Sequence, residues 1–195
     1  MPTLEAAFKL ADTFGNALLA GEQCGIVPPG FAVDNSPTEL LSRIDRARPV
    51  ILLSSSGTKL CHEAAKCDAV FLACLRNYVS VADHLTGKFS NIAVIGAGSR
   101  GEFREEDQMC CAWVVERLVS AGYSPQNRTT MDIVKRWSKV AVNSWIENKS
   151  ASFLRRNGYP ADLEFILKNV ADLDALFTLQ NGEVLMDRDR LAIGA

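Results

Sequence analysis

Residues 49–59 read PVILLSSSGTK, and this stretch decides the fold class. Its first five residues form a continuous apolar run, which is typical of a strand buried on both faces of a parallel sheet. The run stops at three serines and a glycine, and Lys59–Cys67 then has the pattern of a helix. A strand that ends in a polar loop and leads into a helix is the elementary unit of α/β folds.

The same unit occurs twice more along the chain. The apolar run Asp68–Cys74 is followed by Arg76-Asn77 and a predicted helix over Val79–Leu85. The run Ile92–Ile95 is followed by a glycine-rich loop and a predicted helix over Glu105–Ala121. Three such units predict an α/β fold with a mainly parallel sheet. Because crossovers between parallel strands are right-handed, we expect the three loops to meet at the edge where such sheets bind ligands.

The remaining segments add helices and one hairpin. Ser36 is a plausible N-cap and Pro37 a plausible first residue for a short helix. Asn181-Gly182 is a typical hairpin turn. We find no internal repeat and no linker, so residues 1–195 are predicted to form a single domain. The predicted segments are helices over Thr3–Leu19, Thr38–Ile44, Met131–Lys149, Ser150–Gly158 and Ala161–Leu173, and a hairpin over Thr178–Leu185.

Composition excludes several classes of protein. The chain of 195 residues has 21 Lys and Arg against 23 Asp and Glu, which gives no reason to expect binding to nucleic acid. Its longest apolar run, Ala69–Leu75, is far too short to cross a membrane. Met1–Leu10 does not resemble a secretory signal, so we expect a cytoplasmic protein. None of the six cysteines forms a CxxC pair, and reduced thiols that fill the core are expected rather than zinc ligands.

The serine loop, residues 54–59, is a candidate anion site. It combines hydroxyl groups, a glycine and the N-terminus of a helix, where backbone N–H groups favour negative charge. The spacing of a Walker A loop is absent. The alternative interpretation is an ordinary turn between a strand and a helix, with a serine or threonine cap.

A second candidate is the loop Gly96-Ala97-Gly98-Ser99-Arg100-Gly101. Its glycines match GxGxxG, but the loop lies in mid-chain and the next helix begins with Glu105-Glu106-Asp107, which would repel a pyrophosphate. We therefore expect Arg100 to clamp an anion, and Glu106 and Asp107 to be ligands for a hard metal ion. The alternative is that these carboxylates only complement the helix dipole.

Other polar residues are less specific. Asn35 and Asn77 could each stabilise a turn through the side chain. His62 and His84 are interpreted as structural or surface residues. The sequence contains no convincing Ser/His/Asp or Cys/His set, which argues against nucleophilic catalysis.

In this order, the loops resemble the magnesium-dependent 2-phosphosulfolactate phosphatases, the phosphatases of coenzyme M biosynthesis. The resemblance extends from about Leu4 to about Leu185. The matching pieces are Leu18-Leu19-Ala20-Gly21-Glu22, Gly30-Phe31 with Asn35-Ser36-Pro37, Gly57-Thr58, Asn77, Ala97-Gly98-Ser99-Arg100-Gly101, Phe103 with Glu106-Asp107 and Cys110, and Ser152–Leu154 with Gly158 and Asp162.

The resemblance implies a three-layer α/β/α fold and Mg²⁺-dependent hydrolysis of a phosphomonoester on a small sulfonated acid. Under this hypothesis Glu106 and Asp107 are catalytic, with Glu106 holding a water or acting as base, and Glu22 and Asp107 bind the metal. A sulfonate would suit Arg100 or Lys59. The residues expected to bind substrate are Asn35, Ser56, Gly57, Thr58, Asn77, Gly98, Ser99 and Arg100.

Two features depart from the family pattern. Family members usually begin with a strand that carries Asp-Val-Leu-Arg-Ala-Thr, which the sequence from Met1 lacks. Ser56 stands where the family usually has Asn, and Lys59 where it usually has Arg. A missing strand would leave a slot in the sheet, which favours a homo-oligomer. The alternative function is therefore an anion-binding or regulatory relative with impaired catalysis.

Overall fold

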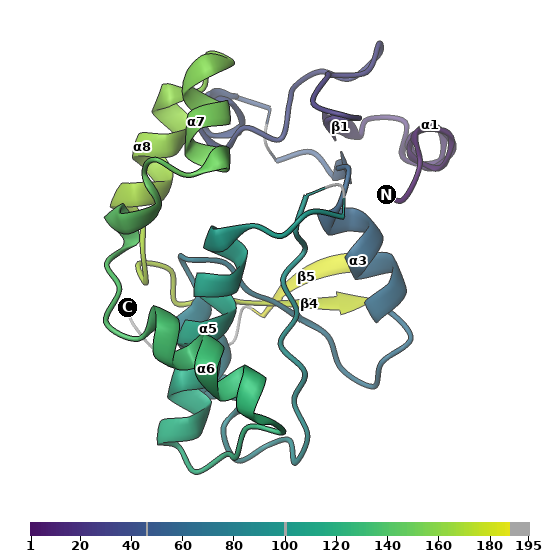
Figure 1. The fold of residues 1–195 in the computed structure, drawn as a ribbon. Helices are drawn as coiled ribbons and strands as arrows, with labels where there is room; N and C mark the ends of the chain where they lie inside the picture. Colours follow the sequence, from purple (N-terminus) through teal and green to yellow (C-terminus); the bar gives the residue numbers. More distant parts are fainter. Residues whose placement is uncertain (46, 100, 188–195) are drawn as a thin grey trace.

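The computed structural model describes residues 1–45, 47–99 and 101–187, and shows a mixed α/β protein (Figure 1). Two separate sheets lie among the helices. The elements are α1 (Leu4–Phe14), β1 (Leu18–Gly21), α2 (Pro37–Ser42), β2 (Val50–Leu53), α3 (Gly57–Ala64), β3 (Phe71–Leu72), α4 (Tyr78–Leu85), α5 (Glu105–Ser120), α6 (Arg128–Trp137), η1 (Val142–Trp145), α7 (Lys149–Arg156), α8 (Pro160–Lys168), β4 (Leu176–Gln180) and β5 (Glu183–Asp187).

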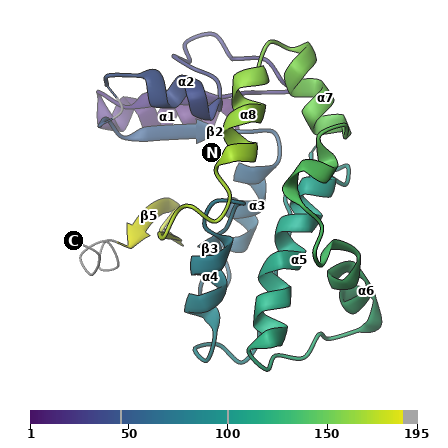
Figure 2. The same cartoon turned by 90° about the vertical axis from the view of Figure 1, so that its left-hand side faces the viewer.

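The first sheet pairs β1 with β2 in parallel, with Leu18 opposite Val50 and Gly21 opposite Leu53. The predicted strand at the start of the 49–59 stretch is thus confirmed, but its expected burial on both faces is wrong. Ile51 and Leu53 are buried, whereas Val50 and Leu52 on the other face are exposed. Helices α1 and α2 lie beside this sheet (Figure 2). Leu18 and Ala20 are buried and form a small apolar cluster with Val33, against which Leu40 of α2 packs.

The helix predicted over Thr3–Leu19 is wrong at its C-terminal end. It ends at Phe14 because Gly15 adopts a left-handed conformation and donates its N–H to the Ala11 carbonyl. This is a common way for a helix to end. The chain then turns, and Leu18–Gly21 forms β1 instead.

The second sheet is antiparallel, with the order β3-β4-β5. The hairpin predicted at Asn181-Gly182 is confirmed, and both turn residues have positive φ, as a tight hairpin turn requires. Phe71 of β3 pairs with Thr178 of β4. The expected three-layer arrangement with a mainly parallel sheet is not confirmed, since the described sheets contain one parallel pair and two antiparallel pairs.

The strand predicted over Ile92–Ile95 is wrong, because these residues belong to no sheet. Ile92 and Val94 pack against the apolar cluster between α4 and α5, while Ile95 is 65% exposed. The alternation typical of a strand is present, but no neighbouring strand pairs with this segment in the described part of the chain. Helices α4 and α5 lie side by side over their length (Figure 2).

The helix predicted over Met131–Lys149 is also interrupted. Helix α6 ends at Trp137, and Lys139 has a φ of 63°, which a helix does not allow. The short 3₁₀ helix η1 follows. Helices α7 and α8 form an arm along one side of the molecule, and α8 packs against α2 (Figure 1).

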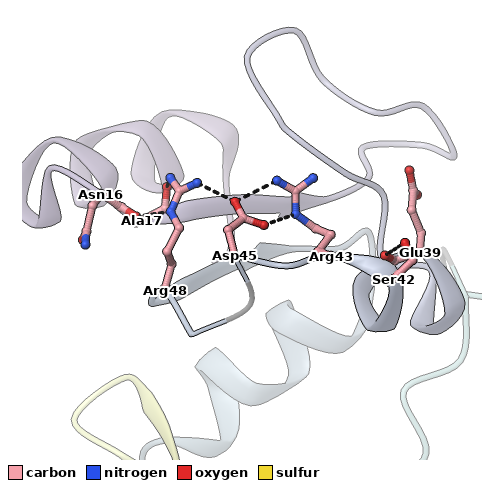
Figure 3. Close-up of polar contacts among 7 residues, drawn as sticks. All are labelled: Asn16, Ala17, Glu39, Ser42, Arg43, Asp45 and Arg48. Atoms are coloured by element: carbon pink, nitrogen blue, oxygen red, sulfur yellow. Dashed lines mark hydrogen bonds and ion pairs between the residues drawn. The ribbon is translucent and has the colours of Figure 1, made fainter.

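The turn between α2 and β2 is held by a charged cluster (Figure 3). Asp45 accepts hydrogen bonds from Arg43 and Arg48, and Arg48 also donates to the carbonyls of Asn16 and Ala17. The cluster therefore joins the α2–β2 turn to the turn that precedes β1.

Two expectations about the surface can be compared with the structure. All six cysteines are free thiols, but Cys24, Cys67 and Cys74 are exposed, so the expectation that the cysteines fill the core is wrong for these three. In the described ranges, no helix has the length and apolar character that a membrane span requires.

Candidate functional site

The carboxylate of Glu22 organises the loop that follows β2. Glu22 comes directly after β1, and its N–H donates to the Leu53 carbonyl at 3.0 Å. Its side chain accepts hydrogen bonds from the Ser55 amide at 2.7 Å, the Ser55 hydroxyl at 2.7 Å and the Gly25 amide at 2.6 Å. A side chain at Gly21 would collide with the Leu53 carbonyl, so glycine is needed for this close approach of the strand ends.

The serine loop is closed by Ser54 and Thr58. The Thr58 hydroxyl donates to the Ser54 carbonyl at 2.9 Å, and the Ser54 hydroxyl accepts from the Thr58 amide at 3.2 Å. Helix α3 begins at Gly57, two residues earlier than predicted, with Ser56 in the N-cap position. Ser56, Gly57 and Thr58 therefore lie together at the N-terminus of α3, where the helix dipole favours an anion.

The glycine-rich loop folds onto the first turn of α5. The Gly98 amide donates to Asp107 Oδ2 at 2.7 Å. Ser99 and Glu102 exchange two backbone hydrogen bonds of 2.9 Å, which closes a tight turn. Gly98 has a φ of 63°, and a Cβ there would lie 2.7 Å from the Glu102 carbonyl. The predicted anion clamp, Arg100, lies outside the described residues.

The environment of Asp107 disfavours its charged form. Burial raises the pKa of the Asp107 carboxyl group, and the neighbouring Glu106 adds to this, while the Gly98 amide and Arg104 act in the opposite direction. Glu106 accepts a 2.8 Å hydrogen bond from the Asn148 side chain at the start of α7. A half-buried acidic pair of this kind is typical of functional sites.

A cavity of about 270 Å³ adjoins Asp107. It lies between α5, α6 and the segment that precedes Gly98. Most of its walls are apolar, and Asp107 and Arg104 contribute the charged groups. Its apolar lining includes Val94, Phe103, Ala112, Val115, Ile133 and Val134.

The two predicted asparagines differ in their surroundings. Asn35 is exposed on the turn before α2. Asn77 is 1% exposed, accepts a hydrogen bond from the Cys74 amide, and donates to the carbonyls of Leu72 and Ala175. These contacts give Asn77 a structural role that joins β3 to the segment before β4. Its expected role in substrate binding stays a prediction.

The structure brings the predicted residues together in two groups. Glu22 lies with the serine loop, and Glu106 and Asp107 lie with Gly98 and Ser99. The N-cap residue of α7, Asn148, donates a hydrogen bond to Glu106 of the second group, and Phe153 of α7 lies near Gly25, whose amide donates to Glu22. Sequence reasoning included Ser55 only as one hydroxyl of the serine loop and assigned no role to Asn148. Asn148 is the N-cap of α7, and the preference for Asn at this position was the signal that could have drawn attention to it.

Comparison with known proteins identifies the family. A family model described as 2-phosphosulpholactate phosphatase matches residues 1–182. The chain belongs to this family. The resemblance inferred from the loops is thereby confirmed, and the matched range contains the serine loop, the Gly98 loop and the acidic turn of α5.

Curated relatives in the 2-phosphosulpholactate phosphatase family are similar over most of the chain. A protein of Clostridium perfringens strain SM101 is 28% identical over 187 residues, which cover 92% of this chain and 73% of that protein. A protein of Caldanaerobacter subterraneus is 27% identical over 191 residues, 95% of this chain and 79% of that protein. A protein of Deinococcus radiodurans is 35% identical over 122 residues, 62% of this chain and 51% of that protein. Each is named a probable 2-phosphosulfolactate phosphatase.

Proposed function

We propose that this chain hydrolyses the phosphomonoester of 2-phosphosulfolactate, or of a related small phosphorylated acid, with Mg²⁺ as cofactor. The observation that carries the proposal is the family match over residues 1–182. The site geometry supports it, because the matched range contains both a helix N-terminus suited to an anion and an acidic pair suited to a cation.

The acidic pair fits a magnesium ion. Burial and the nearby Glu106 raise the pKa of the Asp107 carboxyl group, and a divalent cation would relieve both effects. In the parts of the chain that the structure describes, no three His, Cys, Asp or Glu side chains form a group that could hold a metal. Mg²⁺ is usually held by one or two carboxylates, substrate oxygens and water, so Asp107 can serve as the protein ligand while Glu106 adds negative charge beside it. When bound, Mg²⁺ would neutralise charge on the phosphoryl oxygens.

Glu22 fits a metal less well. Both of its carboxylate oxygens accept hydrogen bonds from Ser55, and one also accepts from Gly25. Its metal-binding role stays a prediction, and we propose instead that Glu22 shapes the serine loop for the anion.

The anionic groups of the substrate are proposed to bind at three loops. The backbone amide of Gly57 and the Ser56 hydroxyl face a phosphoryl or sulfonate group at the start of α3, and Thr58 closes the loop beside them. Gly98 and Ser99 supply the second loop and Asn35 the third. Arg100 remains the proposed cationic clamp.

Glu106 is proposed to orient the attacking water and to take its proton. The water oxygen forms the new bond to phosphorus while the ester P–O bond breaks. The substrate alkoxide leaves and takes a proton from solvent, and Glu106 returns its proton to solvent. Asn148 holds one Glu106 oxygen, which leaves the other available to the water.

The test is phosphate release from 2-phosphosulfolactate by the purified chain, with Mg²⁺ and with a chelator. We expect release that needs Mg²⁺ and that falls roughly a hundredfold or more in Asp107→Asn. Asp132→Asn is the matched control, because Asp132 is an exposed carboxylate on α6 that pairs with Arg128 on the same helix surface, away from Asp107 in sequence. Absence of release from the wild-type chain, or a wild-type rate in Asp107→Asn, would contradict the proposal.

The second candidate is an anion-binding relative without turnover. The hydrogen bonds that Ser55 and Gly25 donate to Glu22 favour this second candidate. A carboxylate that is already hydrogen-bonded in this way is less available to bind a catalytic metal ion. Calorimetry with inorganic phosphate, combined with the release assay, distinguishes the two, since this relative would bind phosphate without hydrolysing the ester. A cytoplasmic location and a homo-oligomer stay predictions.

A further inference from the structure

A buried carboxylate on α8 holds the turn that carries Asn35. Asp162 is 3% exposed. Its Oδ1 atom accepts hydrogen bonds from the Ser36 hydroxyl at 2.9 Å, the Thr38 amide at 3.0 Å and the Thr38 hydroxyl. A buried carboxylate needs such donors to offset the loss of hydration, so these contacts fix the start of α2 relative to α8.

A second contact holds the other side of the same turn. Asp34 is 9% exposed and accepts a 2.8 Å hydrogen bond from the Tyr159 hydroxyl. The other oxygen of Asp34 accepts from the Asn35 amide at 2.7 Å. Tyr159 is the N-cap residue of α8, and Asp162 lies in the first turn of that helix.

Asn35 therefore lies between two residues, Asp34 and Ser36, that are both hydrogen-bonded to the N-terminal end of α8. Its own side chain remains exposed, while its neighbours on each side are buried and bonded to residues more than 120 positions away. An exposed side chain on a backbone that is fixed on both sides suits a group that must meet a ligand in one orientation.

We propose that Tyr159 and Asp162 are positioning residues that hold Asn35 in place for a phosphoryl or sulfonate oxygen. The inference rests on the proposed function and deepens it, because it makes the start of α8 part of the anion site without contact between α8 and the ligand. Displacement of Asn35 weakens ligand binding, whereas the acidic pair on α5 is left unchanged.

The test uses variants that remove one hydroxyl each. Thr38→Val keeps the side-chain volume but loses the hydroxyl that donates to Asp162, and Thr38→Ser restores it. Tyr159→Phe removes the bond to Asp34. The matched control is Tyr123→Phe, because the Tyr123 hydroxyl is likewise hydrogen-bonded, donating to the Phe89 carbonyl and accepting from the Gly87 amide just after the C-terminal end of α4.

We expect the KM for the phosphorylated substrate, and the Kd for inorganic phosphate, to rise roughly tenfold in Thr38→Val and Tyr159→Phe, with kcat changed much less. Thr38→Ser and Tyr123→Phe should keep the wild-type KM and Kd. If Thr38→Val and Tyr159→Phe lose only thermal stability, as is expected of Tyr123→Phe, the positioning role is wrong and the proposed function stands. A wild-type chain that neither hydrolyses the ester nor binds phosphate overturns both.

Discussion

Ser55 donates two hydrogen bonds to one Glu22 carboxylate, from its amide to Oε1 and from its hydroxyl to Oε2, both at 2.7 Å. The Ser55 hydroxyl in turn accepts a 3.0 Å hydrogen bond from the Cys24 amide. The loops after two parallel strands are therefore joined through a single carboxylate. The shape of the serine loop depends on a residue that lies 33 positions earlier in the sequence.

Replacement of Glu22 should destabilise the protein and disorder the serine loop. In Glu22→Gln, one oxygen becomes an amide NH₂ group that faces N–H and O–H donors, and we expect a loss of about 1–3 kcal/mol in the free energy of unfolding. Urea denaturation measures this change. Glu63→Gln is the control, because Glu63 pairs with Lys66 on an exposed helix surface, where little change is expected. Equal stability of Glu22→Gln and wild type would contradict the role of Glu22 in the loop.

Asn77 should act on stability rather than on ligand affinity. Asn77→Ala leaves the Leu72 and Ala175 carbonyls and the Cys74 amide without this partner in a buried site, and we expect a loss of about 2–4 kcal/mol. Asn91→Ala, at an exposed position, is the matched control. A variant with wild-type stability but weakened phosphate binding would instead support the substrate role expected from the sequence.

The Arg43–Asp45–Arg48 cluster should contribute to stability at neutral pH and lose its effect in acid. Hydrogen bonds from Arg43 and Arg48 lower the pKa of Asp45 to about 2, from an ordinary 3.8. A carboxyl group whose pKa is lowered in the folded state stabilises the folded protein at every pH above its ordinary pKa. This contribution disappears as the pH falls from about 4 to 2. When thermal unfolding is measured from pH 7 down to pH 2, the Tm of Asp45→Asn should fall less than the Tm of the wild type. The Tm of Arg43→Gln should also depend less on pH than that of the wild type. If Tm falls equally in all three proteins between pH 4 and pH 2, the cluster does not contribute to stability through the ionisation of Asp45.

The six thiols should differ in reactivity. Burial raises the pKa of Cys111 to about 11 and raises the pKa of Cys110 still further. Because the thiolate is the reactive form, Cys111 at pH 8 should react roughly a hundredfold more slowly than a thiol with the ordinary pKa of 9.0. A chromogenic disulfide reagent should therefore modify the exposed Cys24, Cys67 and Cys74 first. Unfolding in guanidinium should make all six react at similar rates, and fast modification of Cys110 in the folded protein would contradict the burial.

Features determined by neighbouring residues were predictable from the sequence. The strand after Pro49, the α2 helix with its Ser36 cap, the α5 helix and the Asn181-Gly182 hairpin all follow from local turn and cap preferences. Where local patterns were ambiguous, prediction was wrong. Leu18 and Leu19 continue the apolar stripe of α1, and Gly15 was the signal that the helix ends before them.

Features determined by distant contacts were not predictable. The apolar run Ile92–Ile95 looks like a strand, but strand formation requires a pairing partner, and here two of its side chains pack on helices instead. The pairing of Phe71 with Thr178 joins segments more than a hundred residues apart, and nothing local indicates its direction. In the site, the sequence indicated the acidic turn of α5 and the serine loop, whereas the hydrogen bonds from Ser55 to Glu22 and from Asn148 to Glu106 depend on tertiary structure.

The hydrogen bonds that Ser36 and Thr38 donate to Asp162 also constrain how the protein matures. Ser36 leaves the ribosome 126 residues before Asp162, so the turn that carries Asn35 is synthesised long before the group that holds it. Synthesis proceeds at about 5–20 residues per second, which leaves this turn unanchored for several seconds. Nascent chains that stop short of α8 would therefore carry an unanchored Asn35, and the anchoring of this turn becomes a late event in biogenesis.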